Sequence, residues 1–449
     1  MPKASCPAIL IAAPASGQGK TTVACALARL HTRQGRRVRV FKCGPDFLDP
    51  HWLSLASSAP VHQLDLWMTG EADCAQRLHA AAQEADLIII EGVMGLFDGE
   101  PSAADLAQRF DLPVLTVIDA SAMAGTFGAL AWGLQHYRAG LRFGGVLANR
   151  VASTGHADML KDSLRDVAQW QGALMRSDAF ILPERHLGLV VANELGDASQ
   201  RLDAAADALA ITALGQMTDT DLQAWAVTIE LPDLATELFP SAVLQGKTIA
   251  VARDAAFCFL YAANLDCLQA MGAQLTYFSP LGDCAVPTCD ALWLPGGYPE
   301  LHAQTLATNT AMKTSITAHV NAGKPVWAEC GGMMALFDQL TTVDGASYPM
   351  WGVLPGSVSM QKRLAALGPQ QLRVEGGVIR GHAFHYSTCN TAVLPVARTK
   401  AAPGRKLRGE GEALYALGSV RATYFHAWFA SNPKAAAALF GGPVVEATS

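Results

Sequence analysis

Charged side chains are scarce in this sequence. Asp, Glu, Lys and Arg make up 16% of the 449 residues, whereas hydrophobic residues make up 51%. This balance excludes a disordered chain and is typical of a large, well-buried globular protein. The formal net charge is -6 and there is no basic tail, which argues against a nucleic-acid partner. We expect a chain of this length to fold as two or three domains.

The sequence also lacks the marks of a secreted or membrane protein. The 10 cysteines include no C-x-x-C pair, and their scatter is typical of an intracellular protein rather than of a disulfide framework. No apolar run approaches the ~20 residues of a membrane span. Residues 3–15 resemble a short signal peptide, but cleavage there would destroy the phosphate loop described next. We therefore expect a soluble, cytoplasmic protein with no membrane partner.

The segment 9–27, ILIAAPASGQGKTTVACAL, predicts a strand, a phosphate loop and a helix. A nucleotide polyphosphate needs close backbone approach, amide donors at a helix N-terminus, an ammonium and a hydroxyl for Mg2+. The residues that would supply these groups to ATP are Ser16, Gly17, Gln18, Gly19, Lys20, Thr21 and Thr22. Pro14 stands where the usual motif begins with Gly, yet Ser16 and Gly17 can still make the tight turn. The alternative is a Gly/Ser turn that only resembles a nucleotide site.

Acidic residues follow the next two predicted strands. Asp46 and Asp49 come after the strand 36–42, at the edge where open parallel sheets bind ligands. The pair favours a metal or substrate role, and the alternative is an Asx turn that closes the loop. Glu91 ends the buried strand 85–92 and is the expected second Mg2+ ligand opposite Thr21, unless it is a solvated strand end. Asp98 lies in the glycine-rich loop that follows.

Strands and helices continue to alternate through the first half of the chain. Strands are predicted at 113–120, 143–151, 172–176 and 187–191, and a long amphipathic helix at 197–217. This order predicts a doubly wound parallel sheet over residues 1–222. Asn149 ends one strand, where it could reach an adenine edge of ATP or cap the next helix. The pattern loosens over 223–246, which we interpret as a linker.

A second α/β series fills residues 247–449. Within the segment 324–340 a strand ends at Glu329, Cys330 occupies the bend, and two glycines open an amphipathic helix. A Cys at such an elbow is expected to have an exposed sulfur, a pKa lowered by the helix N-terminus, and amides nearby for an oxyanion. Cys330 is therefore the candidate nucleophile, with a buried structural Cys as the alternative. The candidate bases are His382, His385 and His426, of which His426 lies on a short strand that runs into a loop.

Seven motifs resemble, in their order, the cobyrinate a,c-diamide synthase family of corrinoid biosynthesis. They span nearly the whole chain: APASGQGKTT, GPDFLDP, IIIEGVMGLFDG, LPGGYPELHA, AECGGMMAL, GHAFHYS and YFHAWFASNP. The first half is similar to phosphate-loop ligases of the dethiobiotin-synthetase type. The second half is similar to class I glutamine amidotransferase domains, which have a flavodoxin-like α/β fold.

The resemblance implies an ATP-dependent, glutamine-hydrolysing ligase that amidates the a and c carboxylates of cobyrinate through an acyl phosphate. Cys330 would attack glutamine, His426 would shuttle the proton, and amides near Gly297 and Gly331 would hold the oxyanion. Mg2+ would be bound by Thr21, Glu91 and Asp46. Substrate or intermediate would be steered by Asp46, Asp49 and Asp98. The resemblance is compatible with a homodimer.

The sequence departs from the family pattern at two positions. Many class I amidotransferases have Glu, and this family commonly a second His, where Trp428 stands here; a Cys/His dyad is therefore implied. Ala383 replaces a usual acidic residue, so His385 is given no catalytic role. Two alternatives remain: the same chemistry on hydrogenobyrinate or a nickel sirohydrochlorin, or a nucleotide-dependent binding or regulatory protein whose amidotransferase half is inactive.

Overall fold

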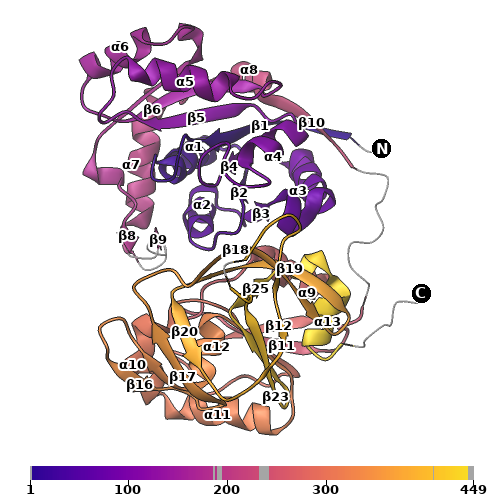
Figure 1. Ribbon diagram of the computed structural model, residues 1–449. Coiled ribbons are helices and arrows are strands. Elements are labelled where there is room, and N and C mark those ends of the chain that lie inside the picture. Colours follow the sequence, from indigo (N-terminus) through magenta and orange to yellow (C-terminus); the bar gives the residue numbers. More distant parts are fainter. Residues whose placement is uncertain (1–2, 186–187, 190–194, 232–241, 408, 443–449) are drawn as a thin grey trace. The chain divides into compact units, whose positions relative to one another are not determined.

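A computed structural model describes residues 3–185, 188–189, 195–231, 242–407 and 409–442. The chain divides into two compact units, Met1–Ala235 and Thr236–Ser449 (Figure 1). Each unit is an α/β structure with its own sheets and its own buried cores.

The first unit is built on a parallel sheet. Its strands are β1 (Lys3–Ala12), β2 (Val38–Cys43), β3 (His62–Leu64), β4 (Leu87–Glu91), β5 (Val114–Asp119), β6 (Phe143–Val151) and β7 (Trp170–Met175). They lie in the order β3-β2-β4-β1-β5-β6-β7, and every neighbouring pair is parallel. The α/β class and the doubly wound parallel sheet predicted from the alternating pattern are confirmed.

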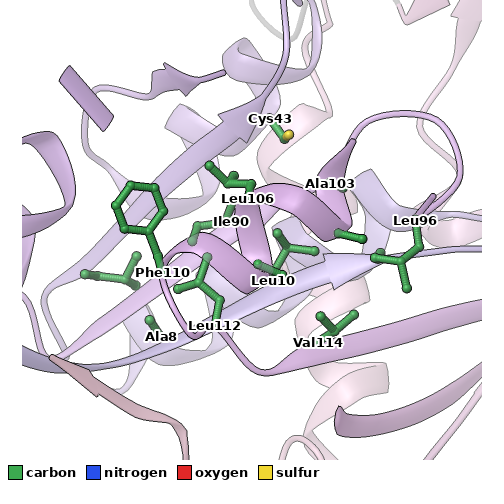
Figure 2. Packing of buried hydrophobic residues seen from close by; sticks show 14 of the residues in the cluster. Ala8, Leu10, Cys43, Ile90, Leu96, Ala103, Leu106, Phe110, Leu112 and Val114 are labelled. Carbon is green, nitrogen blue, oxygen red and sulfur yellow. The ribbon is translucent and has the colours of Figure 1, made fainter. Parts of the chain in front are cut away.

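Helices cover both faces of this sheet. They are α1 (Lys20–Arg33), α2 (Asp49–Ser57), α3 (Glu71–Glu84), α4 (Ala103–Arg109), α5 (Thr126–His136), α6 (Thr154–Asp162), α7 (Ala198–Ala210) and α8 (Asp219–Leu222). Successive residues of a strand point to opposite faces, so β1 supplies two cores. Leu10 packs with α3, α4 and α5 in the core shown in Figure 2. Ile9 and Ile11 pack with α1, α2 and α7.

The end of the first unit differs from the prediction. The segment 223–246, interpreted as a linker, contains β10 (Ala226–Glu230), which pairs antiparallel with β1 from Lys3↔Glu230 to Pro7↔Ala226. These residues therefore belong to the sheet of the first unit. Residues 232–241 of the predicted linker lie outside the described residues.

Two other elements of this unit also differ. The strand predicted at 187–191 is seen only as β9 (Gly188–Leu189), which pairs antiparallel with β8 (Glu184–Arg185) outside the parallel sheet; the remaining residues are not among those described. The helix predicted over 197–217 ends at Ala210. Beyond it the Thr212 hydroxyl donates to the Leu209 carbonyl at 2.7 Å and accepts from the Gly215 amide at 3.2 Å, which turns the chain.

The second unit has a seven-stranded sheet in the order β12-β11-β13-β14-β24-β23-β21. These strands are β11 (Thr248–Ala252), β12 (Gln274–Phe278), β13 (Ala291–Leu294), β14 (Val326–Glu329), β21 (Pro395–Arg398), β23 (Ala413–Leu417) and β24 (Val420–Thr423). Neighbours from β12 to β24 are parallel, and β23 and β21 are added antiparallel. Its helices are α9 (Ala262–Ala270), α10 (Ala303–Thr308), α11 (Thr310–Asn321), α12 (Gly331–Leu336) and α13 (Pro433–Leu439).

Two four-stranded sheets in this unit were not predicted. One has the order β16-β15-β17-β20, from β15 (Phe337–Thr341), β16 (Ser347–Pro349), β17 (Leu354–Met360) and β20 (Ser387–Asn390). The other has the order β22-β18-β19-β25, from β18 (Ala366–Val374), β19 (Gly377–His385), β22 (Lys400–Ala401) and β25 (Phe425–Ala427). The amphipathic helix predicted to run to residue 340 consequently stops at Leu336, where β15 begins.

Across the described ranges, no helix combines the length and the apolar character that crossing a membrane requires.

Two glycines of α5 allow a matched test of helix packing. A Cβ at Gly128 would lie 2.0 Å from the Ser163 carbonyl oxygen at the end of α6, whereas a Cβ at Gly133 would meet nothing within 4 Å. We expect Gly128→Ala to destabilise the protein by about 1–3 kcal/mol through overpacking. Gly133→Ala should instead be neutral or stabilising by about 0.5–1 kcal/mol. Thermal unfolding of both variants checks this, and equal effects would contradict the close packing of α5 on α6.

Candidate active site

The phosphate loop connects β1 to α1 as predicted. Gly17 and Gly19 have φ of 76° and 95°, conformations that favour glycine, and α1 begins at Lys20. The Lys20 ammonium donates to the Ala15 carbonyl at 3.1 Å and to the Met94 carbonyl at 2.6 Å. It therefore lies across the loop, between the loop and the segment that follows β4.

The loop after β4 supports the phosphate loop from one side. The Leu96 amide donates to the Ala13 carbonyl at 2.8 Å, and a Cβ at Gly95 would lie 2.6 Å from the Pro14 carbonyl. Asp98 accepts from the Gly95 amide at 2.9 Å through Oδ2. Asp98 thus shapes this bend, and the substrate-steering role predicted for it stays a prediction.

Asn149 supports the phosphate loop through a hydrogen bond. Its Nδ2 donates to the Gln18 carbonyl at 2.9 Å, and the Gln18 side chain accepts from the Asp119 amide at 2.8 Å. One N–H of the Asn149 amide is therefore bonded to the loop, and the adenine contact predicted for this residue stays a prediction. Asn149 is not a helix cap, because the N-cap of α6 is Ser153. The contact is so close that a Cβ at Gly19 would meet Nδ2 at 2.1 Å.

Lys42, a residue for which the sequence analysis gave no role, lies at the centre of a buried charge cluster. Its Nζ is 2.7 Å from Asp49 Oδ2, 3.1 Å from Glu91 Oε1 and 3.9 Å from Asp46 Oδ2, and its side chain is 3% exposed. Parallel pairing causes the central contact, because Lys42 and Glu91 are register partners on β2 and β4. The sequence did offer one signal for the burial of Lys42. It lies on the same face of the strand as Val38 and Val40, which are buried beside α1.

Burial and charge act against each other in this cluster. Burial disfavours the Lys42 ammonium, but the carboxylates of Asp49 and Glu91 outweigh it and hold its pKa well above the usual value. Burial likewise disfavours the Asp49 carboxylate, yet the Lys42 contact leaves its pKa below the usual value. One ammonium cannot neutralise three carboxylates. Burial accordingly raises the pKa of Asp46 to about 8 and that of Glu91 to about 7.

The residues at Glu91 fit a divalent cation. The Thr21 hydroxyl donates to Glu91 Oε1 at 2.6 Å, and the buried Oε2 has no hydrogen-bond partner among the described residues. A hydroxyl beside a carboxylate with one unused oxygen is an oxygen donor set that Mg2+ accepts. Asp46 fits less well, because its Oδ1 accepts from the amides of Leu48 and Asp49 in a turn. In the part of the chain that is described, no three His, Cys, Asp or Glu side chains form a metal-binding group.

Cys330 lies at a strained bend between β14 and α12. Its φ of 43° and ψ of -107° are unfavourable for a residue with a Cβ, and its amide donates to the Thr423 carbonyl at 2.8 Å. A Cβ at the next residue, Gly331, would lie 2.9 Å from the Gly297 amide nitrogen and 2.8 Å from Pro299 Cδ. The two glycines predicted to hold an oxyanion thus lie close together, and one of them directly follows Cys330.

The predicted state of the sulfur is wrong in two respects. Cys330 is buried, with 4% of its surface exposed, and its pKa is raised rather than lowered. Burial is the first cause and the Glu300 carboxylate the second, and both outweigh the hydrogen bond from the Gly331 amide. A helix of six residues does not compensate for this desolvation. The thiol therefore needs a base to take its proton.

His426 is the imidazole that the fold brings to this bend. It lies on β25, buried to 1% exposure, and a Cβ at Gly296 would meet its Cε1 at 2.4 Å and its Nδ1 at 3.2 Å. The turn at Gly296 and Gly297 therefore contacts the ring of His426 on one side and the residue after Cys330 on the other. Burial holds the pKa of His426 well below its usual value, so that it is a neutral base.

The other two candidate histidines have different environments. His385 is 2.9 Å from the Ser387 carbonyl through Nδ1 and 3.2 Å from Glu412 through Nε2, and it stacks on Tyr424. Both ring nitrogens of His385 thus have partners within the fold, and the sequence analysis assigned it no catalytic role. His382 packs against His426, with ring centroids 5.0 Å apart.

Glu329 positions the strand that carries the base, a role for which the sequence gave no signal. Its Oε1 accepts from the Trp327 indole at 2.7 Å and from the Ala427 amide at 3.1 Å. Burial raises the pKa of this carboxyl to about 8. Since Ala427 directly follows His426, this contact ties β25 to the end of β14.

Two family descriptions match the two units. Residues 9–190 match the CobQ/CobB/MinD/ParA nucleotide binding domain, and residues 248–434 match the CobB/CobQ-like glutamine amidotransferase domain. The first range contains the phosphate loop, Lys42 and Glu91. The second contains Cys330 and His426.

Curated relatives align over almost the whole chain. A hydrogenobyrinate a,c-diamide synthase of Pseudomonas aeruginosa is 58% identical over 98% of both chains. One from Stutzerimonas stutzeri is 56% identical over 98% of this chain and 99% of the relative. A cobyrinate a,c-diamide synthase of Herminiimonas arsenicoxydans is 49% identical over 96% of both. With this coverage and both domains in place, the chain belongs to the family of cobyrinate and hydrogenobyrinate a,c-diamide synthases.

Proposed function

We propose that this chain hydrolyses glutamine and uses the ammonia, with ATP, to amidate the a and c carboxylates of a corrin-ring acid. The observation that carries the proposal is the pairing of two sites in one chain. One is the bend at Cys330 with His426 and the Gly296–Gly297 turn. The other is the phosphate loop with Thr21 bonded to Glu91. The family membership supports the same conclusion.

In the glutaminase site, His426 takes the thiol proton as the sulfur of Cys330 attacks the amide carbon of glutamine. The carbon–nitrogen bond then breaks, and the proton leaves with the nitrogen as ammonia. Water hydrolyses the resulting thioester to glutamate and regenerates the thiol. Amides of Gly297 and Gly331 stabilise the oxyanion. Glu300 is a carboxyl near the sulfur, and burial raises its pKa to about 7; its ionised form suits a substrate with an α-ammonium group.

In the synthetase site, phosphorylation of the acid replaces an oxide leaving group with phosphate, which ammonia then displaces. The phosphate loop and Lys20 bind the polyphosphate of ATP. Thr21 and Glu91 would hold Mg2+, which supplies charge neutralisation for the phosphates. Lys42 keeps the carboxylates of Asp49 and Glu91 in place beside it. Asp46 and Asp49 lie at the end of β2, where we infer that they face the corrin substrate.

Two acids are candidates for the corrin substrate. The two relatives with 56% and 58% identity are named for hydrogenobyrinate, and the relative with 49% identity is named for cobyrinate. We therefore propose hydrogenobyrinate as the first substrate to test. Mass spectrometry of the products formed from each acid with ATP, Mg2+ and glutamine would decide between them.

Replacement of the nucleophile should separate the two half-reactions. We expect Cys330→Ala to abolish amidation with glutamine but to retain it with free ammonia, because the synthetase site is unchanged. Cys284→Ala, which alters an exposed cysteine of the same unit, should retain both. Product formation with each nitrogen source is the measurement. Loss of both activities in Cys330→Ala would contradict the division of labour, and a wild type that releases no ammonia would favour a binding protein.

Replacement of the phosphate-loop lysine should affect both nitrogen sources equally. We expect Lys20→Ala to lose amidation with glutamine and with ammonia, because the phosphates lose their ammonium partner. Lys3→Ala, at an exposed ion pair with Glu230, is the control and should behave as wild type. Unchanged product formation by Lys20→Ala at ordinary ATP concentration would argue against the nucleotide site.

Removal of the buried ammonium should destabilise the protein. We expect Lys42→Met to lower the free energy of unfolding by about 3–5 kcal/mol, because Asp49 and Glu91 lose their compensating charge. Lys3→Met should change it by less than about 1 kcal/mol. Without Lys42 the pKa of Asp49 should rise and that of Glu91 should rise further. Protonation of these carboxyls then removes the cost of burying their charges. The difference between wild type and Lys42→Met should therefore shrink as the pH falls from about 8 to about 5. Denaturant unfolding measures this, and a constant difference would contradict it.

A further inference from the structure

The base of the glutaminase site is packed against a second imidazole. His382 on β19 and His426 on β25 are partners across an antiparallel pair. Their ring centroids are 5.0 Å apart and their planes differ by 20°. Both rings are buried, with 3% and 1% of the residue surface exposed. The plane of His426 is therefore fixed by a parallel ring on one face.

His382 is in turn held by Tyr261. The Tyr261 hydroxyl lies 3.2 Å from His382 Nδ1, within hydrogen-bond distance. Tyr261 packs edge-on against Trp428, with ring centroids 5.1 Å apart and planes at 66°. Trp428 is fully buried, and its backbone amide donates to the Arg380 carbonyl at 2.8 Å. A continuous chain of contacts thus leads from Trp428 through Tyr261 and His382 to His426.

We propose that His382 is a positioning residue for His426: its ring, held by Tyr261 and Trp428, fixes the plane of the base. The inference rests on the proposed glutaminase reaction and deepens it. It assigns a function to His382 and to Trp428, which occupies the position where related amidotransferases have an acidic residue or a second His.

The chemistry of the stack supports this role. An imidazole accepts a proton only along the direction of its ring nitrogen, so the orientation of the His426 ring decides its use as a base. The His382 ring, with its centroid 5.0 Å from that of His426, restricts rotation of His426 out of this plane. His382 itself stays neutral, because burial lowers its pKa to about 3. The proton is held by His426 until it leaves with ammonia, so no further donor or acceptor is required.

Other titratable groups surround the base, and a pH profile must take them into account. His382 and His385 lie on β19, Glu329 and Cys330 at the end of β14, Tyr261 before α9, and Tyr424 just before β25. Glu412 lies one contact further away, against His385. Burial is the main cause of the lowered pKa of His426. A change that admits water should therefore raise the pKa of His426.

Two substitutions of His382 separate the effect of losing the ring from the effect of admitting water to the space that it fills. We expect His382→Ala to lower kcat for glutamine hydrolysis by about tenfold to a hundredfold, since the base is no longer oriented. KM for glutamine should stay near the wild-type value, because His382 does not contact glutamine in this scheme. The acid limb of the pH profile should move to higher pH. His382→Phe keeps a ring at this place, so it should retain more activity than His382→Ala and leave the acid limb in place.

Amidation with free ammonia provides the control for folding. Both His382 variants should retain it, because the synthetase site is untouched. Tyr261→Phe removes only the hydroxyl and should lower kcat less than His382→Ala does. Ile379→Ala alters a buried residue of the same strand and should leave the kcat for glutamine and the pH profile unchanged.

The outcomes distinguish the inference from the proposed function. A wild type without glutamine hydrolysis would overturn the proposed function. An active wild type with wild-type kcat and pH profile in His382→Ala would overturn only the positioning role. Parallel loss of glutamine- and ammonia-dependent amidation in His382→Phe would also overturn it, because the effect would then be structural. A selective loss of kcat with glutamine, smaller for Phe than for Ala, would support it.

Discussion

Close approach of backbone to backbone at the bend of Cys330 is the constraint on which the second unit depends. A Cβ at Gly332 would lie 2.1 Å from the Leu294 carbonyl, and one at Gly297 would lie 2.2 Å from the Ala256 carbonyl. Added atoms at Gly331 and Gly296 would meet the Gly297 amide and the His426 ring. Only glycine fits at these four positions, and the ends of β13 and β14 can therefore meet. The reacting groups come from distant segments because of this contact.

In the first unit the main constraint is the burial of several charges at one edge of the sheet. The parallel register places Lys42 beside Glu91, and the loop after β2 folds Asp49 onto the same ammonium. Lys42 compensates part of the charge of this cluster, and one oxygen of Glu91 remains without a hydrogen-bond partner among the described residues. In the second unit Glu329 is buried without such a cation and is satisfied by the Trp327 indole and the Ala427 amide. Its raised pKa reflects that difference.

Local patterns were sufficient for the strands and loops that carry the main motifs. The apolar runs before Gly17, Glu91 and Cys330 predicted buried parallel strands, and glycine clusters marked the bends. Contacts set by tertiary structure could not be predicted in this way. The bond from Asn149 to the Gln18 carbonyl depends on how β6 lies under the phosphate loop. Likewise, the elbow predicted the position of Cys330, whereas its burial depends on segments distant in the sequence.

The antiparallel pair of β1 and β10 has a consequence for synthesis of the chain. Residues 3–7 of β1 find their partners at 226–230, so this strand is completed by a segment that is translated much later. The N-terminal half of β1 is an unpaired edge until then. This pairing can therefore form during translation only after most of the first unit has been made.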